Sequence, residues 1–108
     1  MAAETITAAG AADPGVALSI LNAGTDNIAV TLADGSVVGQ LKWFVSIAGN
    51  DAILTPASTN GEYVTISFDN AGENACLLWT SAGWSILSRG SGKAAAASVV
   101  AELPVVAT

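Results

Sequence analysis

The fold is decided by the stretch Gln40–Ser88, whose first strand-like run reads Gln40-Leu41-Lys42-Trp43-Phe44-Val45-Ser46-Ile47-Ala48. Every second residue of this run is large and apolar, which is the two-residue period of a half-buried strand. The apolar side consists of Leu41, Trp43, Val45 and Ile47. We expect this side to face the core and the side with Lys42 to face away from it.

Three more alternating runs follow, at Glu62–Asp69, Asn74–Thr80 and Gly83–Ser88, and the last two predict a hairpin. Tight-turn residues separate the runs, because glycine tolerates positive φ and Asn or Asp bonds to the nearby backbone. The turns are Asp34-Gly35, Gly49-Asn50-Asp51, Asn60-Gly61, Asn70-Ala71-Gly72 and Ser81-Ala82-Gly83. This spacing predicts an all-β fold, a compact antiparallel sandwich or barrel of roughly 7–8 short strands with extended N- and C-terminal arms.

A chain of 108 residues predicts one domain. We expect an N-terminal arm over residues 1–15, a β-domain over 16–89, and a C-terminal linker and arm over 90–108. The nearly uncharged segment Ser98–Thr108 fits either an arm docked on a neighbouring protein or a last edge strand of its own domain. The candidate contacts with other subunits are Val99, Val100, Leu103, Val105, Val106, Thr5 and Ile6.

The composition is 52% hydrophobic and 11% charged, against about 25% charged in a typical protein. So much uncharged surface favours contact with another protein. Because nine acidic residues stand against three basic ones, the net charge of −6 repels a polyanion, and we expect no nucleic-acid partner. No run approaches the roughly 20 apolar residues that span a bilayer, so we expect no membrane partner.

The sequence predicts no catalytic, cofactor-binding or metal site. It has no histidine, which excludes a Ser–His–acid triad and the commonest transition-metal ligand. Most of the acids lie in predicted turns, and Asp69-Asn70 with Glu73 fits a solvated turn better than a calcium loop. The single cysteine, Cys76, lies in an apolar run and is expected to be a buried hydrophobe.

Three tryptophans offer the main alternative, because an exposed aromatic ring can stack on a sugar or anchor an interface. Trp43 and Trp79 lie on sides expected to face the core. Trp84 follows Gly83 at a turn, so Trp84 and Tyr63 are the candidate exposed aromatics. They leave carbohydrate open as a partner.

Several stretches in a fixed order resemble a small β-domain of tailed-bacteriophage virion proteins, found in head decoration or cement proteins, head fibres and some tail proteins. The matching stretches are Thr31-Leu32-Ala33-Asp34-Gly35-Ser36-Val37-Val38-Gly39-Gln40, Ala52-Ile53-Leu54-Thr55-Pro56, Val64-Thr65-Ile66-Ser67-Phe68-Asp69-Asn70-Ala71-Gly72-Glu73-Asn74-Ala75, Leu77-Leu78-Trp79 and Gly83-Trp84. The resemblance covers about Thr31 to Ser88.

The resemblance implies a non-enzymatic virion protein on the capsid surface, commonly a homotrimer, that contacts the major capsid protein and copies of itself. Since the chain has no collagen-like or coiled-coil shaft, we expect a capsid decoration protein that stabilises the head shell. The alternatives are a virion-displayed module that binds the host surface or a carbohydrate, and a tail or baseplate structural protein.

Overall fold

The computed structural model describes residues 1–93 and 103–108, and in this part of the chain every regular element is a β-strand. The strands are β1 (Ala3–Ile6), β2 (Gly10–Ala12), β3 (Leu18–Leu21), β4 (Ile28–Leu32), β5 (Leu41–Ser46), β6 (Ala52–Pro56), β7 (Thr59–Asn60), β8 (Thr65–Phe68), β9 (Asn74–Thr80), β10 (Gly83–Gly90) and β11 (Val105–Ala107). The all-β prediction is confirmed. A helix long and apolar enough to cross a membrane is absent from the described residues.

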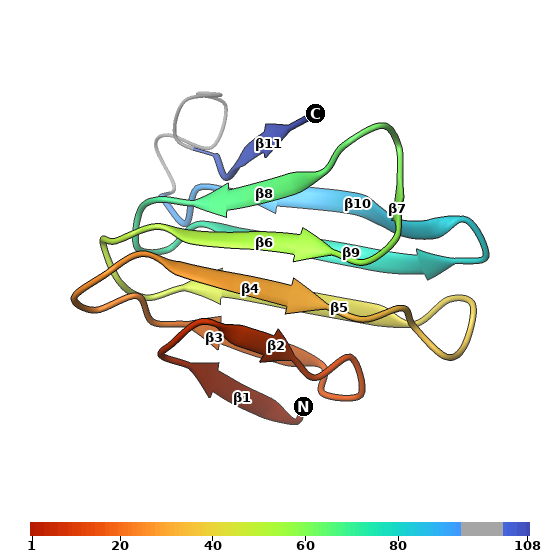
Figure 1. The fold of residues 1–108 in the computed structure, drawn as a ribbon, viewed down its shortest axis with the longest axis horizontal. Coiled ribbons are helices and arrows are strands. Elements are labelled where there is room, and N and C mark those ends of the chain that lie inside the picture. The colour runs from red at the N-terminus through yellow and green to blue at the C-terminus, as the bar shows by residue number, and fades with distance from the viewer. Residues whose placement is uncertain (94–102) are drawn as a thin grey trace.

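The strands form two mixed sheets that lie as two layers (Figure 1). Sheet A has the order β1-β3-β5-β9-β10-β7, and sheet B has the order β11-β8-β6-β4-β2. From β1 to β6 the chain alternates between the sheets, so each pass lays a strand parallel to the strand two before it. The first half of the domain is therefore wound like a short solenoid.

This winding corrects the antiparallel prediction. The Asp34-Gly35 turn does not close a hairpin within one sheet, because it connects β4 in sheet B to β5 in sheet A. Turn residues indicate that the chain reverses direction, but a connection between two sheets needs the same reversal as a hairpin within one sheet, so the residues alone do not distinguish the two. The described residues consequently form eleven short strands, with parallel pairing in both sheets.

The second half of the domain contains the antiparallel pairs. The predicted hairpin is confirmed as β9 and β10, and β9 also pairs with the central strand β5. Gly83, at the start of β10, has a φ of 134°, and a Cβ there would lie 2.7 Å from the backbone carbon of Thr59. Only glycine fits this close approach of β10 to the segment that leads into β7.

The core lies between the two sheets and is built from alternate residues of nearly every strand. Sheet B contributes Val30, Leu54 and Phe68, among others, and sheet A contributes Phe44 and Trp84. The rings of Phe44 and Phe68 bridge the layers, with centroids 6.3 Å apart.

The expected orientation of β5 is wrong. Lys42, Phe44 and Ser46 are buried, whereas Leu41 and Trp43 are 44% and 37% exposed on the outer side. Phe44 fills the space against Phe68, and the Lys42 ammonium is satisfied by polar groups inside the molecule. Burying the outer side instead would leave Phe44 in water and shift the whole strand by one residue.

The segment expected to be an N-terminal arm is part of both sheets. β1 pairs with β3 and β2 pairs with β4. Ile6 and Ala12 are buried in the core. Residues 1–15 thus supply an edge strand to each sheet.

At the other terminus, β11 pairs antiparallel with β8 as the edge of sheet B, which is the second of the two interpretations left open for this segment. Arg89 Nη1 donates a hydrogen bond to the Pro104 carbonyl at 2.8 Å and ties β10 to the residue before β11. The expected boundary between residues 89 and 90 lies inside β10.

Candidate functional site

The two aromatic residues expected to be exposed are buried. Trp84 is fully buried, its Nε1 donates to the Ala33 carbonyl at 3.0 Å, and its ring centroid lies 5.3 Å from that of Trp79. The Tyr63 hydroxyl donates to the Trp84 carbonyl at 2.8 Å, and burial raises the pKa of Tyr63 to about 12. Both side chains belong to the core between the sheets, so the exposure expected for them is wrong.

The candidate contacts near the termini fall in different environments. Thr5 is exposed on the outer side of β1, but Ile6 belongs to the core and cannot contact another protein. Val105 is exposed, whereas Leu103 and Val106 are half-buried and Val106 packs against the core. Val99 and Val100 lie outside the described residues. β1 and β11 lie at opposite sides of the molecule, so the two sets form no common surface (Figure 1).

The outer side of sheet A gathers large apolar side chains from its middle strands. We call this set the apolar face, and it consists of Leu18, Ile20, Leu41, Trp43, Val45, Cys76 and Leu78. Strand register places Trp43 between Leu18 on β3 and Cys76 on β9, and Leu41 beside Leu78. Among the described residues, the outward positions of sheet A carry no charged side chain.

The connection between β4 and β5 extends the apolar face at one end. Val37 and Val38 are 66% and 67% exposed, and the Gly39 amide donates to the Trp79 carbonyl at 2.9 Å, which holds this connection against the end of β9. Exposed apolar patches of this kind are typical of surfaces that contact other proteins.

The outer side of sheet B is different. Its outward positions are mostly small or hydroxylated, such as Ala29, Thr31, Thr55, Thr65 and Ser67. Both sheets are thus uncharged outside, and sheet B also has Ile53 and Val105 at outward positions, but the bulky apolar side chains of sheet A are more numerous and lie on adjacent strands. Sheet A is therefore the better candidate for a tight protein contact.

Inside the molecule, one polar cluster joins the N-terminal strand to the centre of sheet A. Lys42 Nζ donates to the carbonyls of Asp13 and Val16 at 2.9 and 2.7 Å, and lies 3.5 Å from Glu4 Oε2. The same Glu4 oxygen accepts from Ser19 Oγ at 2.6 Å and from the Asp13 amide at 2.9 Å. These bonds engage both charges, so the cluster is structural.

Burial, hydrogen bonds and charge in this cluster shift the pKa values of both Lys42 and Glu4. Burial lowers the pKa of Lys42, although Glu4 opposes this effect. Burial alone would raise the pKa of Glu4, but the hydrogen bonds from Ser19 and Asp13 and the charge of Lys42 outweigh it and hold the pKa below its usual value.

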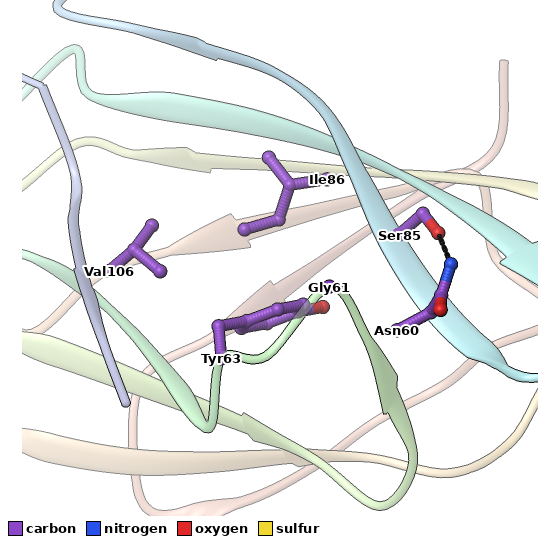
Figure 2. Close-up of a pocket in the computed structure, with 6 residues that line it drawn as sticks. All are labelled: Asn60, Gly61, Tyr63, Ser85, Ile86 and Val106. Carbon is purple, nitrogen blue, oxygen red and sulfur yellow. Dashed lines mark hydrogen bonds between the residues drawn. The ribbon is translucent and has the colours of Figure 1, made fainter.

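A small hollow opens at the edge of the two layers (Figure 2). It has a volume of about 290 Å³ and is lined by Asn60, Gly61, Tyr63, Ser85, Ile86 and Val106. Figure 2 shows the side chains of Tyr63, Ile86 and Val106 facing one another across it. Asn60 Nδ2 donates to Ser85 Oγ at 2.7 Å, so the two polar side chains at its rim bond to each other. Its volume is just below the usual lower limit of about 300 Å³ for small-molecule sites.

The Asp69–Glu73 turn also binds its own groups. The fully buried Glu73 carboxylate accepts from the Asp69 amide at 2.8 Å and from Asn70 Nδ2 at 3.1 Å, and burial raises the Glu73 pKa. Within residues 1–93 and 103–108, no three acidic or cysteine side chains gather as metal ligands. The solvated turn expected from the sequence is therefore wrong for Glu73, whose buried carboxylate holds the turn together. Cys76 is buried as predicted.

Sequence reasoning missed the apolar face because it assigned Leu41 and Trp43 to the core. A signal was present, since Lys42-Trp43-Phe44 is bulky on both sides of the strand period and both sides therefore need cover. Comparison with known protein families finds no match, and no curated protein is significantly similar in sequence, so the function has to be inferred from these surfaces.

Proposed function

We propose that this protein is a structural protein of a tailed-bacteriophage virion, a decoration protein that binds the outside of the head shell as a trimer and stabilises the shell by adhesion. The observation that carries this proposal is the apolar face, where Leu41 and Trp43 are exposed on an uncharged sheet surface. An apolar surface of this kind favours a role in protein assembly. The resemblance of Thr31–Ser88 to virion β-domains suggests the virion as the place of assembly.

Stabilisation of a shell by such a protein follows from simple energetics. A subunit that contacts two neighbouring capsid proteins must lose contacts whenever the seam between them opens. At about 25 cal/mol per Å² of apolar area, a few hundred Å² at each seam contributes several kcal/mol before association costs. Many copies on one shell multiply this modest contribution.

The position of the charged groups supports adhesion to protein rather than to nucleic acid. Lys42 is buried and paired, so it offers no exposed positive charge to a phosphate. The acids Asp26 and Asp34 lie exposed in the connections between strands. A net charge of −6 then repels the packaged genome at long range but leaves the uncharged sheet faces free to contact a protein.

A carbohydrate-binding role loses its candidate residues, because Trp84 and Tyr63 are buried. Trp43 is partly exposed, but its neighbours across the sheet are Leu18 and Cys76. A sugar site needs polar groups beside the aromatic ring to bind hydroxyls. The apolar surroundings of Trp43 favour a protein contact instead.

The test is to add purified protein to capsids that lack it and to measure binding stoichiometry and the temperature of shell rupture. We expect saturable binding at micromolar concentration and rupture at higher temperature. Leu41→Asp charges the apolar face and should weaken binding, whereas Thr55→Asp, on the outer side of β6 in sheet B, serves as the matched control.

Absence of binding to capsids at micromolar concentration would refute the decoration role. Binding to purified tails instead of heads would assign the protein to the tail or baseplate. Loss of binding in Thr55→Asp but not in Leu41→Asp would move the contact from the apolar face to the outer side of sheet B.

A further inference from the structure

The hollow between β10 and β11 lies where a strand of sheet A stops short. β7 pairs with β10 only at Trp84 and Ser85, and the chain then leaves sheet A and leads to β8 in sheet B. Two consecutive residues with positive φ make this turn, Gly61 at 112° and Glu62 at 64°. A positive φ is sterically unfavourable for glutamate, and such strained positions are common where a protein binds a ligand.

The walls of the hollow are apolar, and its polar side chains already bond within the protein. Figure 2 shows Tyr63, Ile86 and Val106 facing one another across it. The Tyr63 hydroxyl donates to a backbone carbonyl of β10, and Asn60 bonds to Ser85 at the rim. A polar group that entered the hollow would lose its hydration and gain few hydrogen bonds in return. The lining therefore favours an apolar occupant.

The size of the hollow limits this occupant to about one side chain. An apolar cavity of about 150 Å³ is large enough to hold a benzene ring. The hollow has a volume of about 290 Å³, so it accommodates one aromatic ring and the carbon that attaches it. The ring of Tyr63 in the wall favours an aromatic occupant, because two aromatic rings attract each other edge to face.

Exposed apolar side chains beside the hollow favour a protein as the source of this ring. Val64 follows Tyr63 in the chain and is 51% exposed, and Leu87 follows Ile86 and is 55% exposed. Leu87 lies at the irregularity in the pairing of β10 with β9, and bulges of this kind redirect side chains next to functional sites. A peptide that inserts a ring into the hollow can also cover these neighbours, as the surroundings of an interface anchor do.

The charge beside the hollow defines the chemistry of such a peptide. Glu62 lies between two of the lining residues in the chain, and its side chain is exposed. The net charge of −6 attracts a basic segment at long range and repels an acidic one. We propose that the hollow binds one aromatic side chain of a partner protein, from a segment in which lysine or arginine adjoins that aromatic residue. This site is separate from the apolar face, and the proposal goes beyond the role on a head shell and does not depend on it.

The first test titrates the full chain with the peptide acetyl-Ser-Lys-Phe-Lys-Ser-amide and follows the backbone amide signals by NMR. We expect saturable shifts centred on Tyr63, Ile86 and Val106, with a Kd of about 0.1–1 mM, because one buried ring gives weak binding. The same peptide with alanine in place of phenylalanine should bind at least about tenfold more weakly. Equal binding of the two peptides, or no saturable shift at about 5 mM peptide, would overturn the proposal.

A pair of variants on β11 locates the site. Val106→Phe fills the hollow with a ring of the chain itself and should weaken binding of the phenylalanine peptide at least about tenfold. The matched control Val105→Phe puts the same ring on the outer side of β11 and should leave binding unchanged. Unchanged binding in a folded Val106→Phe variant would refute the site. The two peptides on the unaltered chain decide the matter if Val106→Phe does not fold.

Two further comparisons test the charge and the kind of ligand. Glu62→Gln should weaken binding about two- to fivefold at low salt, whereas Asp26→Asn makes the same change in net charge at a distant exposed position and should have a smaller effect. Equal effects of the two variants would refute the basic neighbour. Phenethylamine carries the same ring and a positive charge without a peptide. If it bound as tightly as the peptide, the hollow would be a small-molecule site and the protein partner would be refuted.

Discussion

Replacing Trp84 tests the clearest difference between the structure and a ligand-binding interpretation. The side chain is fully buried between the sheets, packs against the tilted ring of Trp79 and donates a hydrogen bond to the Ala33 carbonyl. An aromatic residue buries about 150–250 Å², which at about 25 cal/mol per Å² corresponds to about 4–6 kcal/mol. Alanine keeps a small part of this contribution, so Trp84→Ala should lower the free energy of unfolding by about 3–5 kcal/mol.

Urea unfolding followed by circular dichroism measures this loss. A domain of this size has a total stability of about 5–15 kcal/mol, so the variant should unfold at much lower urea or be partly unfolded without it. Trp84→Phe keeps most of the apolar volume but leaves the Ala33 carbonyl without its donor, and should fall between the two. A change below about 1 kcal/mol in Trp84→Ala would place the ring at the surface and refute the packing described above.

Three further predictions concern charge and backbone. Glu4→Gln should lower the free energy of unfolding by about 1–2 kcal/mol at neutral pH. Hydrogen bonds hold the folded pKa of Glu4 below its usual 4.5, so the wild type has this stability above pH 4.5 and loses it as the pH falls through the folded pKa. Urea unfolding of the variant should therefore be less sensitive to acid than that of the wild type. Tyr63 is the single tyrosine and burial raises its pKa to about 12, so ultraviolet titration of the folded protein should detect phenolate only near pH 12. The stability that this shift contributes is full below the unfolded pKa of about 10 and should be lost as the pH rises through 12. Gly83→Ala should cost about 2–3 kcal/mol in thermal unfolding, because its Cβ would meet Thr59, whereas Gly49→Ala, with open space around the Cβ, should change stability by less than about 0.5 kcal/mol.

Local features of the fold were predictable from the sequence. The alternating run at Leu41–Ser46 and the hairpin around Ser81-Ala82 follow from side-chain period and turn chemistry, and both are present. The partner strands were not predictable in the same way. The reversal at Asp34-Gly35 leads to the other sheet, and only the packing of the whole chain decides between that and a hairpin.

The orientation of β5 shows why the candidate site was harder to predict than the strand. A two-residue period with Lys42 on one side and Trp43 on the other indicates that the lysine faces water. Its ammonium is instead satisfied by Glu4, Asp13 and Val16, which lie at least 26 positions away in the sequence. Such distant contacts leave no local pattern, so the apolar face emerges only from the three-dimensional arrangement.

Two tryptophans of sheet A lie in opposite environments. Trp84 points between the sheets and Trp43 points out of the same sheet, because β10 and β5 present opposite phases of the strand period at these positions. Loss of Trp84 should therefore unfold the chain, whereas a charge at Trp43 should leave it folded, because the Trp43 side chain lies outside the core. If instead both substitutions unfolded the chain equally, Trp43 would contribute to the core as Trp84 does, and the orientation described for β5 would be wrong.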